Sequence, residues 1–405
     1  MKVAIINNTA RIGSTGKIAY GQYVRLKADG HSVQLYYGRT KELKTDEIHC
    51  IDSRFEIFIH GMLARITGLH GYFSNCATSK LLHMLDDFKP DIVQLYNLHG
   101  YYLNINRLLR YLKKKEIPTV YSMLDEFPYL GRNCYLYDKE ILSPEAVLNY
   151  KDKNHYPITW TFTWNKNYYE SKKELYARNN MVFAGPQWVT ERAVQSGLVK
   201  QSQIRVVDEY VETEKTFYPR DKYSLIEKEL LDTDKKIIIG VAPYSSNRKG
   251  GNIFINIAER FEDNKNYIFV YVGMDVKNVK TPGNCIVKGY IYNQDMLAEY
   301  YSIADLHVCP SLADTMPNSC LDALACGTPV IGFKNTGVPY IADEPMGQFV
   351  ENKDVEALCE LIRKSKKKDR EVAKGCREYA LSRYTPEVYY RKMYGIYEGI
   401  DKANG

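Results

Sequence analysis

The sequence predicts an α/β fold with parallel sheets in two domains, and three observations support that prediction. Residues 305–333 read as strand, acidic loop, helix and strand, because the apolar run Leu306–Cys309 precedes a helical pattern that ends at Gly327. The chain begins with the same order of elements, and a glycine-rich loop follows its first strand, Val3–Asn7. A length of 405 residues is too great for one compact core, so we expect two domains.

The composition is that of a globular protein and excludes several other classes. The apolar content of 45% is ordinary, and no apolar run reaches the roughly 18 residues of a transmembrane helix. The nine cysteines are scattered and form no CxxC pair, so we expect a reducing cytoplasm, no disulfide framework and no structural zinc. The N-terminus runs straight into a strand, so we expect no signal peptide, and no nucleic-acid motif is present.

The positive charge is concentrated in the first half of the chain. Residues 1–215 carry 29 Lys and Arg against 23 Asp and Glu, whereas the remainder carries 26 of each kind. Such an excess suits an anionic membrane surface or a phosphate-bearing acceptor. A merely solvated surface explains the same excess, and both interpretations are open at this point.

Two acidic residues mark the strand–helix unit of residues 305–333. Asp314 falls in the loop and Asp322 in the second turn of the helix, with seven residues between them. Carboxylates so placed can accept hydrogen bonds from sugar or ribose hydroxyls, and the N–H groups at the helix start can meet a phosphate. We expect a ligand at this carboxyl end of the sheet. An ordinary amphipathic helix is the alternative.

The stretch resembles the pattern Glu, seven residues, Glu of family 4 glycosyltransferases, which are retaining enzymes of the GT-B fold that use nucleotide sugars. This chain has Asp at both acidic positions and keeps the small-residue run that ends in Gly327-Thr-Pro-Val330. The resemblance implies a catalytic role for Asp314, which would orient the donor sugar, and it implies that Asp322 binds ribose hydroxyls. It also implies further donor contacts between them, at Thr315, Met316, Pro317 and Asn318.

The resemblance covers nearly the whole chain and implies two Rossmann-like domains that face each other across a cleft. Residues 1–215 would present the acceptor and residues 216–385 would hold the nucleotide sugar. Residues 386–405 would form a helix that crosses back to the first domain. Members of this family usually have Asn in the turn after the last strand of the first domain, where this chain has Asp208 and Glu209.

Two cations stand at the start of the first helix of the second domain. Arg248 and Lys249 are followed by glycines, and two cations with backbone donors make a clamp for a pyrophosphate. Such a pair taken alone is more often a solvated surface. Lys249-Gly250 matches the family's Lys-Gly element, whose lysine binds the donor phosphates, whereas the arginine of many members is Pro243 here. The resemblance therefore gives Arg248 and Lys249 a catalytic role that needs no metal ion.

We expect the remaining donor contacts from glycine-containing loops that follow two strands. Gly13, Ser14 and Gly16 follow the first strand in a loop expected to precede a helix that starts near Lys17. The loop is not GxGxxG, so by itself it is as much a turn as a phosphate site. In the resembling family this loop lines the cleft, which implies donor binding. The same family holds the nucleotide base near a later strand end, which implies contacts from Gly289 and Tyr290.

Two further candidates follow neighbouring strands of the first domain. His99 comes after the strand Ile92–Tyr96 and is a candidate acceptor contact, with a histidine that bonds a loop as the alternative. Asp125 comes after the strand Thr119–Met123, where the family shows His-Asp. Leu124 replaces that histidine, so the resemblance gives Asp125 a catalytic role and leaves no imidazole there.

Two segments of the first domain have an open interpretation. Residues 54–70 place their large apolar side chains on one helical stripe, which we expect to face the core, with a membrane-surface helix as the alternative. Tryptophans and tyrosines alternate with lysines in residues 130–180. That pattern fits an acceptor-recognition insertion or a surface loop with a small core of its own.

The resemblance as a whole implies a metal-independent hexosyltransferase without a cofactor. It would move a sugar from a UDP- or GDP-linked donor to a hydroxyl of a saccharide or lipid-linked saccharide. The closest resemblance is to enzymes of capsule, O-antigen (lipopolysaccharide) and exopolysaccharide biosynthesis, which implies a cytoplasmic protein with peripheral contact to the inner membrane surface. Three alternatives are a GT-B sugar-nucleotide epimerase, a non-catalytic sugar-nucleotide binder and a basic membrane-surface scaffold.

Overall fold

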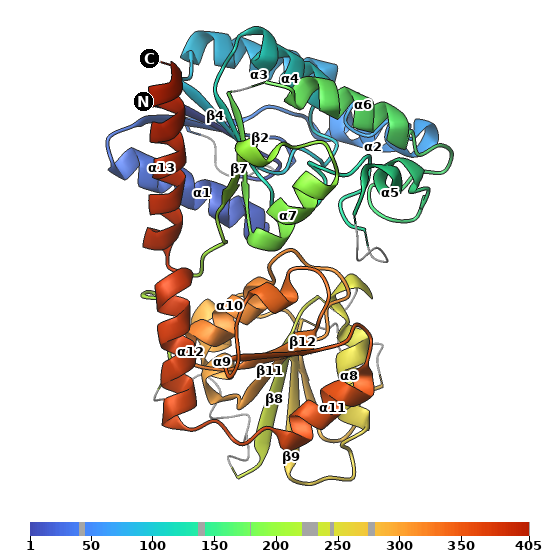
Figure 1. The fold of residues 1–405 in the computed structure, drawn as a ribbon, viewed down its shortest axis with the longest axis vertical. Coiled ribbons are helices and arrows are strands. Elements are labelled where there is room, and N and C mark those ends of the chain that lie inside the picture. Colours follow the sequence, from blue (N-terminus) through green and yellow to red (C-terminus); the bar gives the residue numbers. More distant parts are fainter. Residues whose placement is uncertain are drawn as a thin grey trace. The chain divides into compact units, whose positions relative to one another are not determined.

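A computed structural model shows two compact units, and each is a parallel sheet covered by helices (Figure 1). The structure describes residues 1–39, 45–136, 142–178, 180–220, 234–243, 247–273 and 280–404. The first unit comprises Met1–Val207 together with Tyr390–Gly405, and the second comprises Asp208–Tyr389. The predicted α/β fold with two parallel sheets is confirmed.

The first unit contains a seven-stranded parallel sheet. In sheet order its strands are β3 Ile48–Cys50, β2 Ser32–Tyr37, β1 Lys2–Asn7, β4 Ile92–Leu95, β5 Thr119–Ser122, β6 Met181–Gly185 and β7 Ile204–Val206. The direction of winding reverses between β1 and β4, which pair in parallel with Ile6 beside Leu95. The loops after β1 and β4 therefore lie at the switch point, where open α/β sheets bind their ligands.

Helices of the first unit pack against this sheet, with α3, α4 and α6 next to one another (Figure 1). They are α1 Gly13–Ala28, α2 Arg54–Thr67, α3 Asn75–Phe88, α4 Ile105–Lys114, α5 Pro144–Asn149, α6 Asn165–Tyr176, α7 Gln187–Gln195 and the 3-10 turn Gln201–Gln203. The last helix, α13 Pro386–Asn404, joins this unit from Tyr390 onward. Its Tyr397 hydroxyl donates to Gln94 Oε1 of β4 at 2.9 Å, which ties the C-terminal helix to the first sheet.

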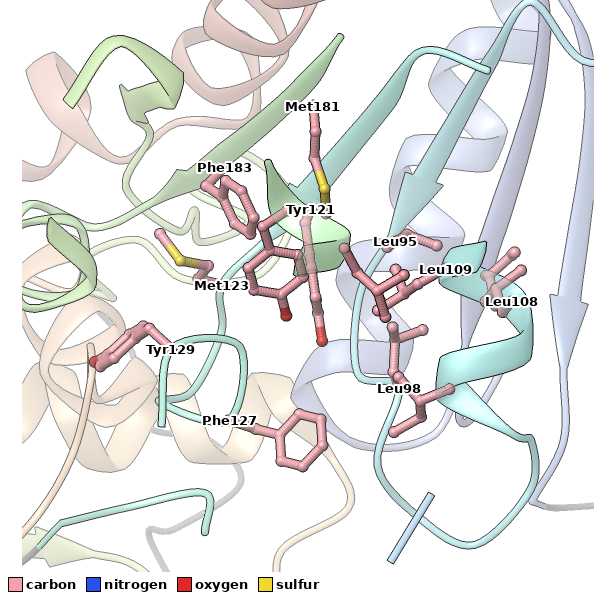
Figure 2. Close-up of a cluster of buried hydrophobic side chains, with 14 of the residues drawn as sticks. Leu95, Leu98, Leu108, Leu109, Tyr121, Met123, Phe127, Tyr129, Met181 and Phe183 are labelled. Carbon is pink, nitrogen blue, oxygen red and sulfur yellow. The ribbon is translucent and has the colours of Figure 1, made fainter. Parts of the chain in front are cut away.

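The core of the first unit lies between the sheet and α4 and continues into the loop after β5 (Figure 2). Tyr121 of β5 and Phe183 of β6 pack in this cluster with leucines from β4 and α4. Met123 and Phe127, which flank Asp125, are 0% and 2% exposed and belong to the same cluster. The loop that carries Asp125 is therefore anchored in the core on both sides.

The second unit contains a six-stranded parallel sheet. In sheet order its strands are β10 Cys285–Lys288, β9 Tyr267–Val272, β8 Lys236–Val241, β11 Leu306–Cys309, β12 Val330–Phe333 and β13 Gly347–Val350. The winding reverses between β8 and β11, which pair in parallel with Leu306 beside Ile238. The loops after β8 and β11 are therefore the ones that border this switch point.

Two hydrophobic clusters cover the two faces of the second sheet. The helices are α8 Gly251–Glu259, α9 Gln294–Ile303, α10 Asn318–Ala325, α11 Val355–Lys364 and α12 Arg370–Arg383, with 3-10 turns at Asn247–Lys249 and Val338–Tyr340. Ile237 and Ile239 of β8 join the cluster of α9, α10 and α12, whereas Ile238 joins that of α8 and α11. This alternation is what a strand buried on both faces requires.

The apolar stripe of residues 54–70 does not face the core, so that prediction is wrong. The segment does form a helix, α2, but Phe55 is 73% exposed and Phe58 is 66% exposed. The buried residues of α2 are His60, Gly61 and Ala64. The helix packs through these residues because His60 Nδ1 bonds the Ser74 hydroxyl at 2.8 Å, which satisfies the buried ring.

Residues 142–178 contribute to the main core of the first unit, which contradicts the interpretation as a loop with a core of its own. Val147 of α5 and Tyr169 and Leu175 of α6 belong to the same hydrophobic cluster as the sheet. Residues 137–141 and residue 179 of this predicted insertion lie outside the described part of the chain. Among the described residues, no helix is both long enough and apolar enough to cross a bilayer.

Candidate functional site

Asp314 lies in the loop after β11 and is paired with two cations from the loop after β8. Its side chain is 7% exposed, forms an ion pair with Lys249 and lies 3.8 Å from Arg248 Nη1. An isolated buried carboxylate would be costly, and these two cations compensate its charge. Three of the residues to which the sequence analysis gave a catalytic role therefore form one group at the switch point.

Backbone contacts hold the two loops together. The Leu312 N–H donates to Arg248 O at 2.7 Å, and the Arg248 guanidinium donates to Ala313 O. Gly250 has a φ of +69°, and a Cβ there would lie 2.0 Å from the carbonyl oxygen of Pro310. Only glycine fits this close approach, so the Lys-Gly element is a geometric requirement of the loop.

The turn after β12 completes the surroundings of Asp314. Thr336 Oγ1 accepts the Asp314 N–H at 2.9 Å, and the Gly337 N–H donates to Asp314 O at 2.8 Å. A Cβ on Gly337 would lie 1.7 Å from Thr315 O. Loops after three adjacent strands thus fix one carboxylate, which is the preorganisation that a binding site requires.

The group carries a net positive charge that is partly open to solvent. The Arg248 and Lys249 side chains are 19% and 23% exposed, and Asp314 supplies one negative charge against their two. Both cations stand immediately before α8. The partial positive charge at the start of that helix therefore adds to theirs. The arrangement suits an anion with two phosphates.

Glu209 lies beside this group, and the sequence analysis did not name it as a site residue. It is 6% exposed, and its N–H contacts Met316 Sδ at 3.3 Å. Burial first, and then the charge of Asp314, raise the pKa of Glu209 to about 8. A carboxyl group with that pKa is mostly protonated at neutral pH and can donate a hydrogen bond. Glu209 lies in the turn where members of the resembling family have Asn, and this position could have identified it as a site residue.

The residues between the two acids lie at the start of α10. Thr315 and Met316 are 3% and 6% exposed, Pro317 precedes the helix and Asn318 is its first residue. The buried Oδ1 atom of Asn318 has no hydrogen-bond partner within the described residues. An amide oriented this way can contact a ligand at the helix start.

Asp322 and the predicted base contacts come from elements other than the loop of Asp314. Asp322 is partly buried in the second turn of α10. The pKa of Tyr301 on α9 is raised first by the burial of Tyr301 itself and next by the charge of Asp322. Gly289 and Tyr290 follow β10, which β9 and β8 separate from β11. Tyr290 is 64% exposed, and its ring centre lies 4.7 Å from that of Tyr292. The predicted base contacts therefore follow a strand that is not adjacent to β11.

In the first unit, His99 and Asp125 form a pair across two loops. His99 Nε2 and Asp125 Oδ2 are 2.5 Å apart, and the side chains are 12% and 6% exposed. The expectation that no imidazole is available beside Asp125 is therefore wrong. Because β4 and β5 are adjacent, their carboxyl ends meet, and His99 reaches Asp125 from the loop of the neighbouring strand.

Surrounding contacts fix the orientation of this pair. Asp125 Oδ1 accepts the Phe127 N–H at 3.0 Å, and the His99 ring stands edge-on to Phe127 and Tyr156 at 5.5 Å from each ring centre. A carboxylate can only accept, so Nε2 of His99 donates to Asp125 Oδ2. Nδ1 is buried and has no partner among the described residues. Water or an acceptor hydroxyl could complete its bonding.

The pair also belongs to the one cluster in the described part of the chain with the spacing of metal ligands. Cys134 joins His99 and Asp125, and their ligand atoms all lie within 4.8 Å of one another. Histidine, carboxylate and thiolate are ligands that zinc accepts. A metal bound through these atoms would replace the hydrogen bond between His99 and Asp125.

Gly13, Ser14 and Gly16 form the first turn of α1, not a loop before a helix that starts near Lys17 as expected. Gly13 has a φ of +75°, which favours glycine at the bend into the helix. A Cβ on Gly16 would lie 2.7 Å from Thr9 Oγ1. These residues stand at the carboxyl end of β1, beside the loop that carries His99.

The match to a known family falls in the second unit. Residues 221–383 match the family model described as Glycosyl transferases group 1. That range contains both cations and both acids of the predicted donor site, and it covers less than half of the chain. A comparison with curated proteins found no match.

Solved structures resemble the whole chain. The sucrose-phosphate synthase of Thermosynechococcus elongatus aligns over 99% of each chain with 16% identity and a TM-score of 0.68. Anabaena HepE, solved in complex with UDP-glucose, aligns over 99% of this chain and 100% of its own, with 13% identity and a TM-score of 0.64. WaaG, a glycosyltransferase involved in lipopolysaccharide biosynthesis, aligns over 97% and 98%, with 15% identity and a TM-score of 0.65. At such identities the likeness shows the fold, which is GT-B.

Proposed function

We propose that this protein is a retaining glycosyltransferase that moves a sugar from a nucleotide diphosphate sugar to an acceptor hydroxyl. The observation that carries the proposal is the buried Asp314 held between Lys249 and Arg248 at the switch point of the second sheet. The group lies within the region similar to group 1 glycosyl transferases. The resemblance of its sequence to retaining enzymes supports retention at the anomeric carbon.

The donor site would act mainly by stabilising the leaving group. When the bond between the anomeric carbon and the phosphate breaks, negative charge develops on the nucleoside diphosphate and must be neutralised. Lys249, Arg248 and the N–H groups at the start of α8 would supply that neutralisation without a metal ion. Asp314 would hold both cations in place before the donor arrives and would orient the sugar hydroxyls.

The remaining candidates of the second unit would position the donor. Asp322 would accept hydrogen bonds from the ribose hydroxyls, and Gly289 and Tyr290 would border the base. Thr315, Met316, Pro317 and Asn318 would border the sugar and phosphates at the start of α10. Protonated Glu209 would add a hydrogen-bond donor beside Asp314.

We assign acceptor binding to the first unit. The loops after β1, β4 and β5 meet at one end of its sheet, with the pair of His99 and Asp125 among them. The pair would hold the acceptor hydroxyl for attack on the same face from which the nucleotide leaves. The donor phosphate would take the proton of that hydroxyl, so the imidazole would orient the acceptor and would not have to act as a strong base. The helix start with Gly13, Ser14 and Gly16 would border the reacting group.

The comparisons support a more specific hypothesis for donor and pathway. HepE was solved with UDP-glucose and WaaG acts in lipopolysaccharide biosynthesis, which favours a UDP-linked hexose and a role in cell-surface polysaccharide biosynthesis. The acceptor would be a saccharide or a lipid-linked saccharide at the inner face of the membrane. The basic excess of residues 1–215 agrees with such an acceptor.

A thermal-shift screen against UDP, GDP, ADP and their common sugars tests the donor site. A ligand that binds the folded state raises Tm by mass action, so the shift reports affinity. We expect a shift with one nucleotide that is lost in Lys249→Ala and reduced in Asp322→Ala. Lys374→Ala, which removes a lysine that is 74% exposed on α12, is the matched control. No shift with any nucleotide would refute the donor site.

Turnover of the nucleotide that binds is measured next. Release of the free nucleotide from its sugar, increased by an acceptor, is the expected result. Binding without release would favour a non-catalytic sugar-nucleotide binder, for which the two Asp residues in place of the family's Glu are the specific observation. Conversion of the sugar without any acceptor would favour an epimerase.

A further inference from the structure

We propose that α2 and the irregular segment 158–164 form one membrane-docking surface that inserts aromatic side chains into the interface of an anionic bilayer. The inference deepens the proposed function, because a lipid-linked acceptor would bring the enzyme to such a surface. It rests on the exposure, spacing and charge of these two segments of the first unit. It does not depend on the donor site in the second unit.

The apolar stripe of α2 faces solvent over the whole length of the helix. Phe55, Phe58, Ile59 and Ile66 are 73%, 66%, 38% and 48% exposed, and their spacing places them on one helical face. The helix is fixed at both ends, since Ser53 Oγ accepts the Glu56 N–H at 3.1 Å and Gly68 closes it with a φ of +77°. A rigid helix that exposes phenylalanine and isoleucine is the geometry of an interfacial helix.

The segment 158–164 exposes its large side chains by strict alternation. Ile158, Trp160, Phe162 and Trp164 are 41%, 59%, 61% and 41% exposed, whereas Thr159 between them is 3% exposed. An ordinary surface segment would turn its aromatic residues inward and its threonines outward. This segment buries Thr159, exposes Thr161 and Thr163 only partly and turns its apolar row outward, so we expect that row to meet a partner outside the chain.

Hydrogen bonds join the two segments into one surface. The Trp160 N–H donates to Arg65 O at 2.8 Å, and the Trp164 Nε1–H donates to Thr67 O at 2.7 Å. A Cβ on Gly68 would lie 1.9 Å from Phe162 O, so the segment lies directly against the end of α2. The two apolar rows therefore belong to one continuous part of the surface.

The charges around this surface favour an anionic bilayer over a neutral protein partner. Arg54 at the start of α2 and Lys166 at the start of α6 are exposed, and Lys151 and Lys153, with Asp152 between them, precede the aromatic row. The carboxylate of Glu56 accepts the Cys76 N–H at 3.0 Å at the start of α3, so it is directed away from the apolar stripe. Tryptophans beside basic residues are the combination found at membrane–water interfaces.

Sedimentation with vesicles tests the proposal on the full chain. We expect the protein to bind vesicles of phosphatidylcholine containing about 30% phosphatidylglycerol, and to bind much less to phosphatidylcholine alone. The bound fraction should fall about tenfold in Phe55→Ser/Phe58→Ser and in Trp160→Ser/Phe162→Ser. Val24→Ser/Leu381→Ser, which removes exposed apolar side chains on α1 and α12, should bind like wild type.

The outcomes separate this proposal from the proposed function. Wild-type protein that does not bind anionic vesicles, or variants that bind them as well as wild type, would overturn the docking surface. A dimer that the same substitutions turn into a monomer, without vesicle binding, would assign the surface to a second copy and also overturn it. The nucleotide shift should persist in the surface variants, and vesicle binding should persist in Lys249→Ala, so either proposal can fail alone.

Discussion

Each unit carries one buried aspartate paired with basic side chains at the carboxyl end of its parallel sheet, but the two pairs differ in charge. Asp314 follows β11 and meets two permanent cations, Lys249 and Arg248. Asp125 follows β5 and meets one imidazole, that of His99. The first group joins one carboxylate to two cations, whereas the second joins one carboxylate to one imidazole.

The difference matches the two tasks of a group transfer. A leaving diphosphate needs fixed positive charge, and an acceptor hydroxyl needs a partner that can accept its hydrogen bond. In the proposed function the same position on a parallel sheet would serve both tasks, and the two aspartates differ in their partners. Each of the following experiments changes one side of this comparison.

The largest expected effect comes from loss of the fixed charge. Lys249→Ala should lower turnover of the nucleotide sugar about 10²–10³-fold, because one preorganised donor to the developing charge is removed. Steady-state release of the nucleotide measures it, with Lys374→Ala as the control. An unchanged rate would show that Lys249 only holds Asp314 in place.

A smaller loss is expected when the pair in the first unit is broken. His99→Gln should lower acceptor-dependent transfer about a hundredfold and leave donor hydrolysis close to wild type. Rates with and without acceptor measure the two reactions, and His83→Gln on the exposed side of α3 is the matched control. Equal loss of both reactions would contradict the assignment of this pair to the acceptor.

Glu209 sharpens the comparison, because burial first and then the charge of Asp314 raise its pKa. In the folded protein the pKa of Glu209 is raised to about 8, whereas in the unfolded chain it is near 4.5. Between these values folding takes up a proton, so stability falls as pH rises and levels off above about pH 8. Glu209→Gln should remove this loss and raise Tm by several degrees near pH 8, with little change near pH 5.

Calorimetric scans across that pH range measure the effect. Glu214→Gln, an exposed glutamate nearby in the chain, should keep the slope of the wild type. A Glu209→Gln variant with the same pH slope as wild type would show that Glu209 is ionised in the folded state. It would then weaken the positive charge assigned to this group.

Loss of the Asp322 carboxylate charge in α10 should have a modest effect on nucleotide binding. Asp322→Asn should weaken nucleotide binding about fivefold to tenfold, because a charge-assisted hydrogen bond to ribose becomes a neutral one. Titration calorimetry measures it, with the exposed Asp263→Asn as control. A loss as large as that of Lys249→Ala would move Asp322 into the phosphate group.

The smallest expected effect is that of metal removal. Treatment with EDTA should leave transfer unchanged, because the proposed site neutralises the phosphates with Lys249 and Arg248. Cys134→Ser should likewise keep the activity, apart from any loss of stability. A loss of activity that zinc restores would instead make His99, Asp125 and Cys134 a metal centre.

Local patterns were sufficient to locate most strands and to single out residues that meet at a strand end. The strands Leu306–Cys309 and Val330–Phe333 end where the turn residues predicted, and the strand-end residues Lys249 and Asp314 meet in space. Parallel strands bring their carboxyl ends to one edge, so residues that follow adjacent strands meet without any further information. That rule needs only the order of the strands.

Contacts between segments that are distant in sequence could not be predicted from local patterns. The sequence predicted an inward stripe for residues 54–70, and the structure exposes it because His60 and Ala64 take the buried face. A helical period indicates which residues share a face but not which face is covered. Only the tertiary structure shows which segment of the chain covers a given helix face.

The sequence by itself determined the α/β class, the paired acids and the cations beside them, because these depend on local periodicity, turn residues and spacing. The tertiary structure decided that His99 serves Asp125, that Glu209 stands beside Asp314 and that the aromatic rows of α2 and 158–164 lie together. Each of these depends on which loops and segments become neighbours. Burial and sheet order fix those neighbours, and no single stretch of sequence contains them.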